Sequence, residues 1–325
     1  MTSIRRSLAA AAALFVAAAL PPPLRVSALE AQAPDVSQTP INLVRITESI
    51  AMLIGAGGNI GVSIGEDGIF LVDDQYAPMT PKIRAVLDSL DQRPVRLIVN
   101  THWHGDHTGG NENFGKSGSV IVAHENVRRR MSVDQFMAEL GDTVKAAPKG
   151  ALPIVTFPDR VMFHLNGDNI QAIHVRRAHT DGDVIVRWAE QNVIHTGDIY
   201  FNGFYPFIDL SSGGSLDGLI AAVDTILALS NEHTRIIPGH GPLSNAAELK
   251  VYREMLIGVR ARLRREIARR RSLEDVLAAG VTKEWDEKWG QGFMKPEVFT
   301  RIAFASVKAA ADAAARRRPA RRGGS

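Results

Sequence analysis

A short apolar run followed by a cluster of metal-binding residue types constrains this chain more than any other feature. Residues 95–100 read VRLIVN, and their β-branched side chains predict a buried strand. Residues 101–107 follow directly and read THWHGDH. The ligand-type residues in this loop are His102, His104, Asp106 and His107. Histidine nitrogen and carboxylate oxygen are ligands that zinc accepts, and one loop offers more of them here than one ion takes from a single loop. The loop therefore predicts two metal ions at the carboxyl end of a strand, where open α/β sheets bind their ligands.

Three further ligand-type residues stand in glycine-bracketed turns, each after an apolar strand-like run. They are His179, Asp198 and His240. Loops at strand ends are where a rigid scaffold presents its chemistry. Any one of these residues alone would be equally well explained as an ordinary turn residue. Their appearance together, downstream of the loop at residues 101–107, predicts that they converge on the same metal site.

This order of residues resembles the metallo-β-lactamase superfamily over about residues 41–243. Strands and helices alone predict only an α/β fold, whereas the resemblance implies an αββα sandwich of two mixed sheets with outer helices. It also implies two Zn²⁺ ions per chain, with iron as an open alternative. The implied ligands are His102, His104 and His179 for one ion, Asp106, His107 and His240 for the other, and Asp198 as the bridge between them.

The bridging position narrows the choice of activity. The chain contains no Cys, and the best-known β-lactamases of this superfamily with a three-histidine first site carry Cys at the position of Asp198. Glyoxalase II and the lactonases resemble this chain there. The resemblance implies a metal-dependent hydrolase in which a hydroxide activated by two metals attacks a carbonyl, with Asp106 as the catalytic residue that orients the nucleophile. We expect a β-lactam-type cyclic amide as substrate. The alternatives are a lactone or other ester, a thioester, and a non-catalytic metal-binding relay protein.

Other residues near these strand ends have two possible roles each. Asp73, Asp183 and His195 either hydrogen-bond to the metal ligands or cap turns and pack. The aromatic residues Phe204, Tyr205 and Phe207 follow Asp198 in the loop, in a chain with only 6% aromatic residues. They form either an apolar wall for the substrate or packing between the two halves of the fold.

The beginning of the chain has the pattern of a secretory signal peptide. Arg5 and Arg6 precede an apolar run at residues 8–20, and residues 26–28 read VSA, a small-residue cleavage site. The run is short for a membrane span, although an uncleaved anchor is the alternative. The sequence therefore predicts a periplasmic or secreted protein with no stable membrane insertion after cleavage.

Composition divides the chain into five segments. We expect a signal peptide at 1–28, a flexible leader at 29–40, a metallo-β-lactamase-like domain at 41–245, a C-terminal helical extension at 246–315 and a disordered basic tail at 316–325. Within them the periodicity predicts helices at 80–90, 126–137, 216–229 and 246–271, and a mobile connection at 141–152 near the mouth of the site.

The formal charge of +3 comes from the two ends of the chain. The signal and tail segments together hold more arginine charge than this excess, so the segment between them is net negative. A negative domain argues against a nucleic-acid partner and leaves a small molecule as the expected partner. Nothing in the sequence indicates the oligomeric state.

Overall fold

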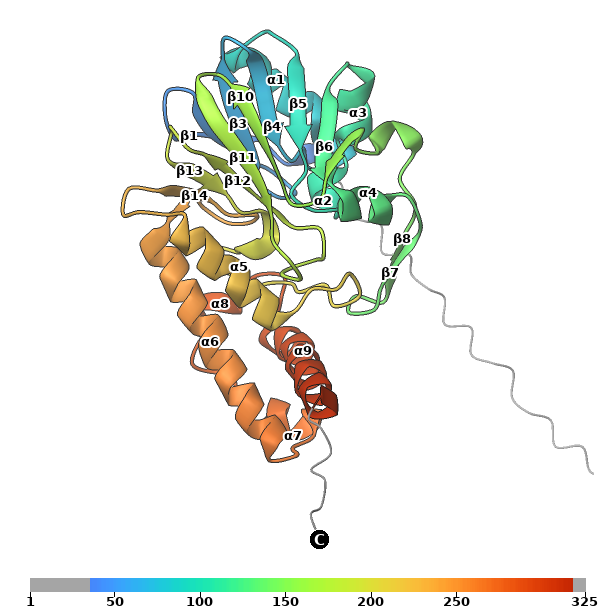
Figure 1. Ribbon diagram of the computed structural model, residues 1–325, viewed down its shortest axis with the longest axis vertical. Helices are drawn as coiled ribbons and strands as arrows, with labels where there is room; N and C mark the ends of the chain where they lie inside the picture. The colour runs from blue at the N-terminus through green and yellow to red at the C-terminus, as the bar shows by residue number, and fades with distance from the viewer. Residues whose placement is uncertain (1–35, 318–325) are drawn as a thin grey trace, which may run out of the picture. The chain divides into compact units, whose positions relative to one another are not determined.

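Two mixed β-sheets form the centre of the protein, which a computed structural model describes over residues 36–317 (Figure 1). The first sheet has the spatial order β1-β2-β3-β4-β5-β6-β9. Its strands are β1 (Asn42–Arg45), β2 (Ile50–Ile54), β3 (Ile60–Gly65), β4 (Gly68–Val72), β5 (Val95–Val99), β6 (Val120–His124) and β9 (Val155–Phe157). Strands β1 to β4 are antiparallel, and β4, β5, β6 and β9 run parallel.

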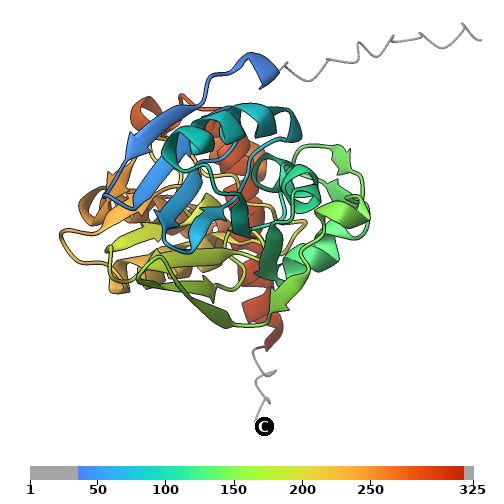
Figure 2. The ribbon, with the colours of Figure 1, turned by 90° about the horizontal axis from the view of Figure 1, so that it is seen from above.

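The second sheet is antiparallel except for one parallel pair, β13 with β14. Its strands follow the chain in spatial order: β10 (Arg160–Leu165), β11 (Asp168–His174), β12 (Val184–Trp188), β13 (Val193–His195), β14 (Arg235–Ile237) and β15 (Ser244–Asn245). Figure 2 shows the blue strands of the first sheet beside the yellow-green strands of the second. The predicted pair of mixed sheets is confirmed.

Helices cover the outer faces of both sheets. Helix α1 (Thr80–Leu90) begins with a proline in its first turn and buries Ile83 and Leu87 against the first sheet. Helices α5 (Leu216–Ala228) and α6 (Ala246–Ala268) bury their apolar faces over the second sheet. A separate core that includes Phe70 and Trp188 fills the space between the sheets. Each such fully buried side chain contributes roughly 1.5–3 kcal/mol. The result is the expected αββα sandwich.

The expected C-terminal extension contains further helices beyond α6 in the part of the chain that the structure describes. Its helices are α7 (Leu273–Ala278), α8 (Asp286–Trp289) and α9 (Pro296–Arg317), and α9 lies against α5 and α6. The boundary predicted at residue 315 is two residues early, because α9 continues to Arg317. The run at residues 309–317 is built largely from Ala and Arg, which are strong helix formers.

The predicted helix at 126–137 is wrong in its second half. Helix α4 (Glu125–Met131) is followed by a hairpin of β7 (Gln135–Met137) and β8 (Asp142–Val144), so the expected connection at 141–152 contains a strand. The carboxylate of Asp134 accepts hydrogen bonds from the Ala146 backbone and from Lys145. These contacts reach across the hairpin, and helical periodicity does not reveal them.

Short helical turns complete the described residues. They are η1 (Val36–Gln38), η2 (Ala77–Met79), α2 (Gly105–Thr108), α3 (Asn111–Lys116), η3 (Lys149–Ala151) and η4 (Gly197–Ile199). The end of the predicted leader is docked on α1, where Lys82 donates a hydrogen bond to the Thr39 carbonyl at 3.0 Å.

The predicted signal peptide lies outside the described residues, as do residues 29–35 of the leader and 318–325 of the tail. Among the residues that the structure describes, no helix combines the length and apolar character needed to cross a bilayer.

Candidate metal centre

The loop that follows β5 is held in place by buried hydrogen bonds. Asn100 and Asn111 bond to each other through their side-chain amides at 3.1 and 2.9 Å. The backbone and hydroxyl of Thr101 both donate to the carboxylate of Asp73, each at 2.7 Å. The one-turn helix α2 then begins directly after His104. The loop is thereby fixed before any ion binds, and its imidazoles lie close to His179, Asp198 and His240 from the second half of the fold.

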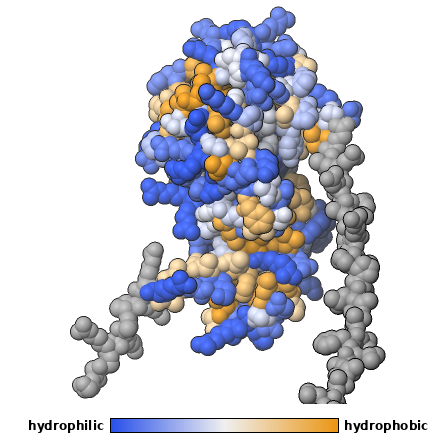
Figure 3. All heavy atoms as spheres, turned by 90° about the vertical axis from the view of Figure 1, so that its right-hand side faces the viewer, coloured by the Kyte–Doolittle hydropathy of each residue, from blue (hydrophilic) through white to orange (hydrophobic). Residues whose placement is uncertain are grey.

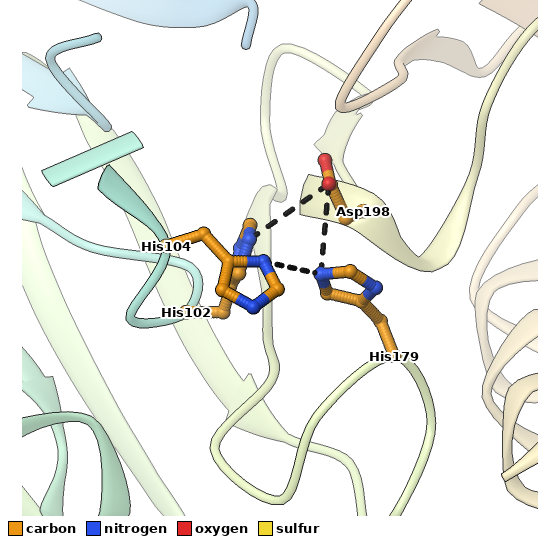
Figure 4. Close-up of side chains that lie close together, drawn as sticks. All are labelled: His102, His104, His179 and Asp198. Atoms are coloured by element: carbon orange, nitrogen blue, oxygen red, sulfur yellow. Dashed lines mark hydrogen bonds and ion pairs between the residues drawn. The ribbon is translucent and has the colours of Figure 1, made fainter. Parts of the chain in front are cut away.

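A first cluster consists of His102, His104, His179 and Asp198, whose side chains point toward one another (Figure 4). All four are buried, and their possible ligand atoms lie within 4.8 Å of one another. His179 Nε2 lies 2.9 Å from His104 Nδ1. Asp198 Oδ2 lies 3.6 Å from the Nε2 of His179 and 3.8 Å from that of His102.

A second cluster consists of Asp106, His107 and His240, again with ligand atoms within 4.8 Å. Asp198 Oδ1 lies 3.1 Å from the Nε2 of His107 and 3.4 Å from that of His240. Asp106 Oδ2 lies 3.3 Å from His240 Nε2. The two oxygens of Asp198 thus face different clusters. The structure brings together all seven residues singled out in the sequence, in the two groups that the resemblance implies.

Four of the five histidines use their outer ring nitrogen to bond to the protein. The Nδ1 atoms of His102, His107 and His179 bond to Thr101 Oγ1, Asp73 Oδ2 and the Phe207 carbonyl, at 3.0, 2.8 and 2.8 Å, and His104 Nε2 bonds to Asp209 Oδ2 at 3.0 Å. Such bonds fix the tautomer and orient the free nitrogen toward a metal. Asp73, predicted as a supporting residue, therefore orients His107 directly and His102 through Thr101.

The inner atoms of the first cluster need a cation. In the neutral rings of His104 and His179 the outer nitrogen carries the proton, so two lone pairs face each other across 2.9 Å. His102 Nε2 is fully buried and has no hydrogen-bond partner. Unpartnered buried polar atoms are costly unless something else satisfies them. The donor set therefore fits metal ions, and zinc accepts these atom types.

The charges of the two clusters differ in the metal-free protein. Burial lowers the pKa of His179 to about 4, so its ring is neutral at neutral pH and able to bind a metal. Burial acts in the same direction on His240, but the carboxylates of Asp198 and Asp106 outweigh it and raise the pKa of His240 to about 9. Burial raises the pKa of Asp106, but His107 and His240 outweigh it and bring the value to about 2. A metal ion held by the second cluster would replace the proton on His240.

Asp183 and His195 hold the turns that carry the ligands. Asp183 accepts hydrogen bonds from the backbone amides of His179 and Thr180 at 2.7 and 2.8 Å. His195 Nδ1 accepts from the Gly197 amide, and its Nε2 donates to the Asn59 carbonyl at 3.0 Å. Neither side chain bonds to a ligand side chain, so both act on the backbone of the site.

Glycines allow two other loops to approach the clusters closely. A Cβ atom on Gly58 would lie 2.0 Å from His107 Cε1, and one on Gly239 would lie 2.1 Å from Asp198 Oδ1. The loop that contains Gly58 is held by Gln75, whose side chain donates to the Gly58 carbonyl at 2.8 Å. No residue with a side chain fits at either glycine position without moving a ligand.

Asp209 is a supporting residue that the sequence did not indicate, and it bonds directly to a ligand side chain. Its side chain is fully buried; one carboxylate oxygen accepts from His104, and the other accepts from the Ser212 amide at 2.8 Å. The sequence offers one weak signal, an acidic residue directly after the apolar run that ends at Ile208. A turn cap would give the same pattern, and the pairing with His104 follows from the path of the loop.

The aromatic loop after Asp198 divides between the site and the C-terminal helices. Phe207 is buried, with its ring 5.8 Å from the rings of His104 and His179. Tyr205 turns the other way: it is fully buried and stacks on Phe299 of α9 at 4.4 Å. Of the two alternatives, packing applies to Tyr205, because its ring is fully buried against α9. Phe204 is partly exposed and lies beside Gly292.

Comparison with known proteins gives a match to the family model of the metallo-β-lactamase superfamily over residues 35–240, more than half of the chain. Among curated proteins, the hydroxyacylglutathione hydrolase of Nitrosococcus oceani is 31% identical over 162 residues, which are 49% of this chain and 54% of that protein. The chain spans about half the length of the curated relatives it matches first.

Solved structures share the fold. A metallo-β-lactamase from Pontibacter korlensis superposes with a TM-score of 0.55 at 18% identity, over 66% of this chain and 98% of that one. The metallo-β-lactamase FIM-1 from Pseudomonas aeruginosa, in a mono-zinc form, gives a TM-score of 0.53 at 20% identity, over 67% and 95% of the two chains. Both similarities cover about two thirds of this chain.

Proposed function

Because the chain belongs to the metallo-β-lactamase superfamily, we propose that it is a zinc-dependent hydrolase of carboxylic esters and thioesters. The observation that carries this proposal is the position of Asp198, with one oxygen toward each of two histidine-containing clusters. A carboxylate can bridge two ions about 3.5–4 Å apart, the spacing of two-metal hydrolytic sites. When bound, such ions lower the pKa of water to about 7 and polarise a carbonyl oxygen.

The open side of the centre is formed by the second cluster. The side chains of Asp106 and His240 are 22% and 25% exposed, whereas those of His102, His107 and His179 are at most 1% exposed. Substrate and water therefore approach past Asp106. Its low pKa keeps its carboxylate ionised at neutral pH, so it can accept a hydrogen bond from water and orient a lone pair toward a carbonyl carbon.

Asp198 favours an ester or thioester over the cyclic amide expected from the sequence. The resemblance associates an Asp at this position with glyoxalase II and the lactonases, and a curated relative is named a hydroxyacylglutathione hydrolase. A β-lactam-type cyclic amide is the second candidate, favoured by the three histidines of the first cluster, His102, His104 and His179.

We place the reaction in the periplasm or outside the cell, on the basis of the signal-like residues 1–28. Cell fractionation of the full chain, with detection of the mature N-terminus, tests this location. A cytoplasmic protein that retains its first residues would contradict it.

The activity is tested with protein stripped by a chelator and reloaded with Zn²⁺. The substrates are a p-nitrophenyl ester, an acyl thioester, a lactone and a chromogenic cephalosporin. We expect ester or thioester hydrolysis that needs metal and falls on the order of 10²-fold or more in His179→Ala and Asp106→Asn. Asp224→Asn is the control, since this carboxylate pairs with Arg253 away from the centre. A fully metal-loaded protein that hydrolyses none of the four substrates would refute the proposal.

A further inference from the structure

A cavity of about 280 Å³ lies beside the metal centre, beneath the β7–β8 hairpin. Gly105, which lines it, stands in the chain between His104 and Asp106, one from each cluster. Because consecutive Cα atoms are about 3.8 Å apart, the cavity borders the backbone of the metal loop directly. Trp103 lines it as well, with its ring 4.7 Å from that of His104.

The hairpin turns one face toward this cavity. Gln135 of β7 is paired with Val144 of β8, and both line the cavity. The next pair, Phe136 with Thr143, points to the opposite face, where the Phe136 side chain is 62% exposed. Side chains alternate between the faces of a strand, so Val144 and Thr143 offer matched positions inside and outside the cavity.

The cavity takes an uncharged group. Its apolar lining includes Met131, Val133 and Ala147. Its charged side chains already have partners: Arg130 pairs with Asp181 at 2.8 Å, Lys145 with Asp134 at 2.9 Å, and Glu112 with Lys116 at 2.9 Å. A cavity of this size and lining, with its charges neutralised, is suited to part of a small molecule rather than to an ion.

The tip of the hairpin is tied to the loop that supports His104. The Ala138 amide donates to Ser211 Oγ at 3.0 Å, and Ser211 donates to Glu139 at 2.8 Å. On the same loop, Ser212 Oγ accepts from Trp103 Nε1 at 3.0 Å. Figure 3 shows hydrophobic residues gathered on the side of the molecule that carries this hairpin. The roof of the cavity is thus fastened to the wall of the metal centre.

We propose that this cavity binds an aliphatic or aromatic acyl group, the part of the substrate bonded to the reacting carbonyl carbon. This inference rests on the proposed function and deepens it: the substrates are esters or thioesters of medium-sized apolar acids. We assign the cavity to the acyl group rather than to the alcohol or thiol because Trp103 and Gly105, the chain neighbours of His104 in the first cluster, line it. His240, at the open side of the centre, does not.

The test compares a series of p-nitrophenyl esters from acetate to octanoate and a second series of acetate esters with lengthening alcohols. We expect kcat/KM to rise with the acyl chain by about tenfold or more, and to change little with the alcohol. Val144→Trp fills the cavity, so we expect the ratio of octanoate to acetate kcat/KM to fall to about one. Thr143→Trp, on the outer face of the same strand, keeps the full gain.

Binding of the product acids to metal-free protein gives a readout independent of activity. Calorimetry is expected to show octanoate bound about tenfold or more tighter than acetate in the wild type and in Thr143→Trp, with this difference lost in Val144→Trp. Equal hydrolysis of all acyl lengths, a preference set by the alcohol, or equal binding of the two acids would overturn the inference. Absence of any hydrolysis together with selective octanoate binding would refute the proposed function and support the cavity.

Discussion

The substitution Asp209→Asn isolates the support of one metal ligand with little change of volume. Asp209 accepts from His104 Nε2 at 3.0 Å with one oxygen and from the Ser212 amide at 2.8 Å with the other. An asparagine replaces one of these oxygens by an NH₂ group. Whichever way the amide is turned, a donor then faces a donor in a fully buried place.

The expected magnitude follows from the bond that is lost. A hydrogen bond with a charged partner is worth roughly 1.5–3 kcal/mol. Loss of a partner that orients a metal-binding histidine typically lowers metal affinity by about 10–100-fold, which corresponds to roughly 1.4–2.7 kcal/mol. The two ranges agree, so Asp209→Asn should lower the affinity for one of the two ions by about 10–100-fold.

The assay is a competition titration of metal-free protein with Zn²⁺ and a chromophoric chelator, which resolves the two binding steps. Asp224→Asn serves as the control, because that carboxylate pairs on the surface with Arg253. Thermal melting of both metal-free variants separates loss of affinity from loss of fold. Wild-type affinity within about twofold for both ions in Asp209→Asn would refute the role assigned to this residue.

Three further predictions concern packing, charge and the aromatic loop. Gly58→Ala places a Cβ 2.0 Å from His107 Cε1, so we expect metal analysis to find one ion per chain instead of two, whereas Gly150→Ala, whose nearest neighbour is 3.4 Å away, keeps both. In metal-free protein His240 has a pKa raised from 6.5 to about 9, so its contribution to stability is complete below pH 6.5 and is lost as the pH rises through 9. Melting curves should therefore show a decline over this range, and His240→Gln should flatten it. Tyr205→Phe loses the hydrogen bond that the hydroxyl donates to the Asp286 carboxylate of α8 at 2.8 Å, so chemical denaturation should show a free energy of unfolding lower by roughly 1.5–3 kcal/mol, with kcat/KM unchanged. A large loss of kcat/KM would indicate that Tyr205 contributes to the substrate wall.

The ligand residues could be picked out from sequence because each stands at the end of a β-branched strand. The loop after β5 and the turns at His179, Asp198 and His240 carry their signal locally. Helix α1 was also predictable, because its signals, a proline in the first turn and apolar residues at helical spacing, all lie within its own eleven residues. Local order of this kind is what propensity and periodicity report.

Features set by distant contacts were missed. The sequence of the aromatic loop did not indicate which way the Tyr205 ring points, because that depends on its contact with Phe299 of α9, far downstream. The end of α4 depends on bonds from Asp134 across the hairpin. Asp209 depends on a loop path that brings it to His104, 105 positions earlier in the chain. In each case tertiary packing decides between local alternatives that the sequence leaves nearly equal.

In the proposed mechanism, Asp198 joins two clusters into one centre that holds a pair of metal ions and needs both for hydrolysis. Stepwise addition of Zn²⁺ to metal-free protein, with bound metal and ester or thioester hydrolysis measured on the same samples, tests it most directly. We expect activity to reach its plateau at two bound ions per chain in the wild type and to stay near background in Asp198→Ala. Full activity with no bound metal, or an Asp198→Ala protein that binds two ions and hydrolyses at the wild-type rate, would contradict it.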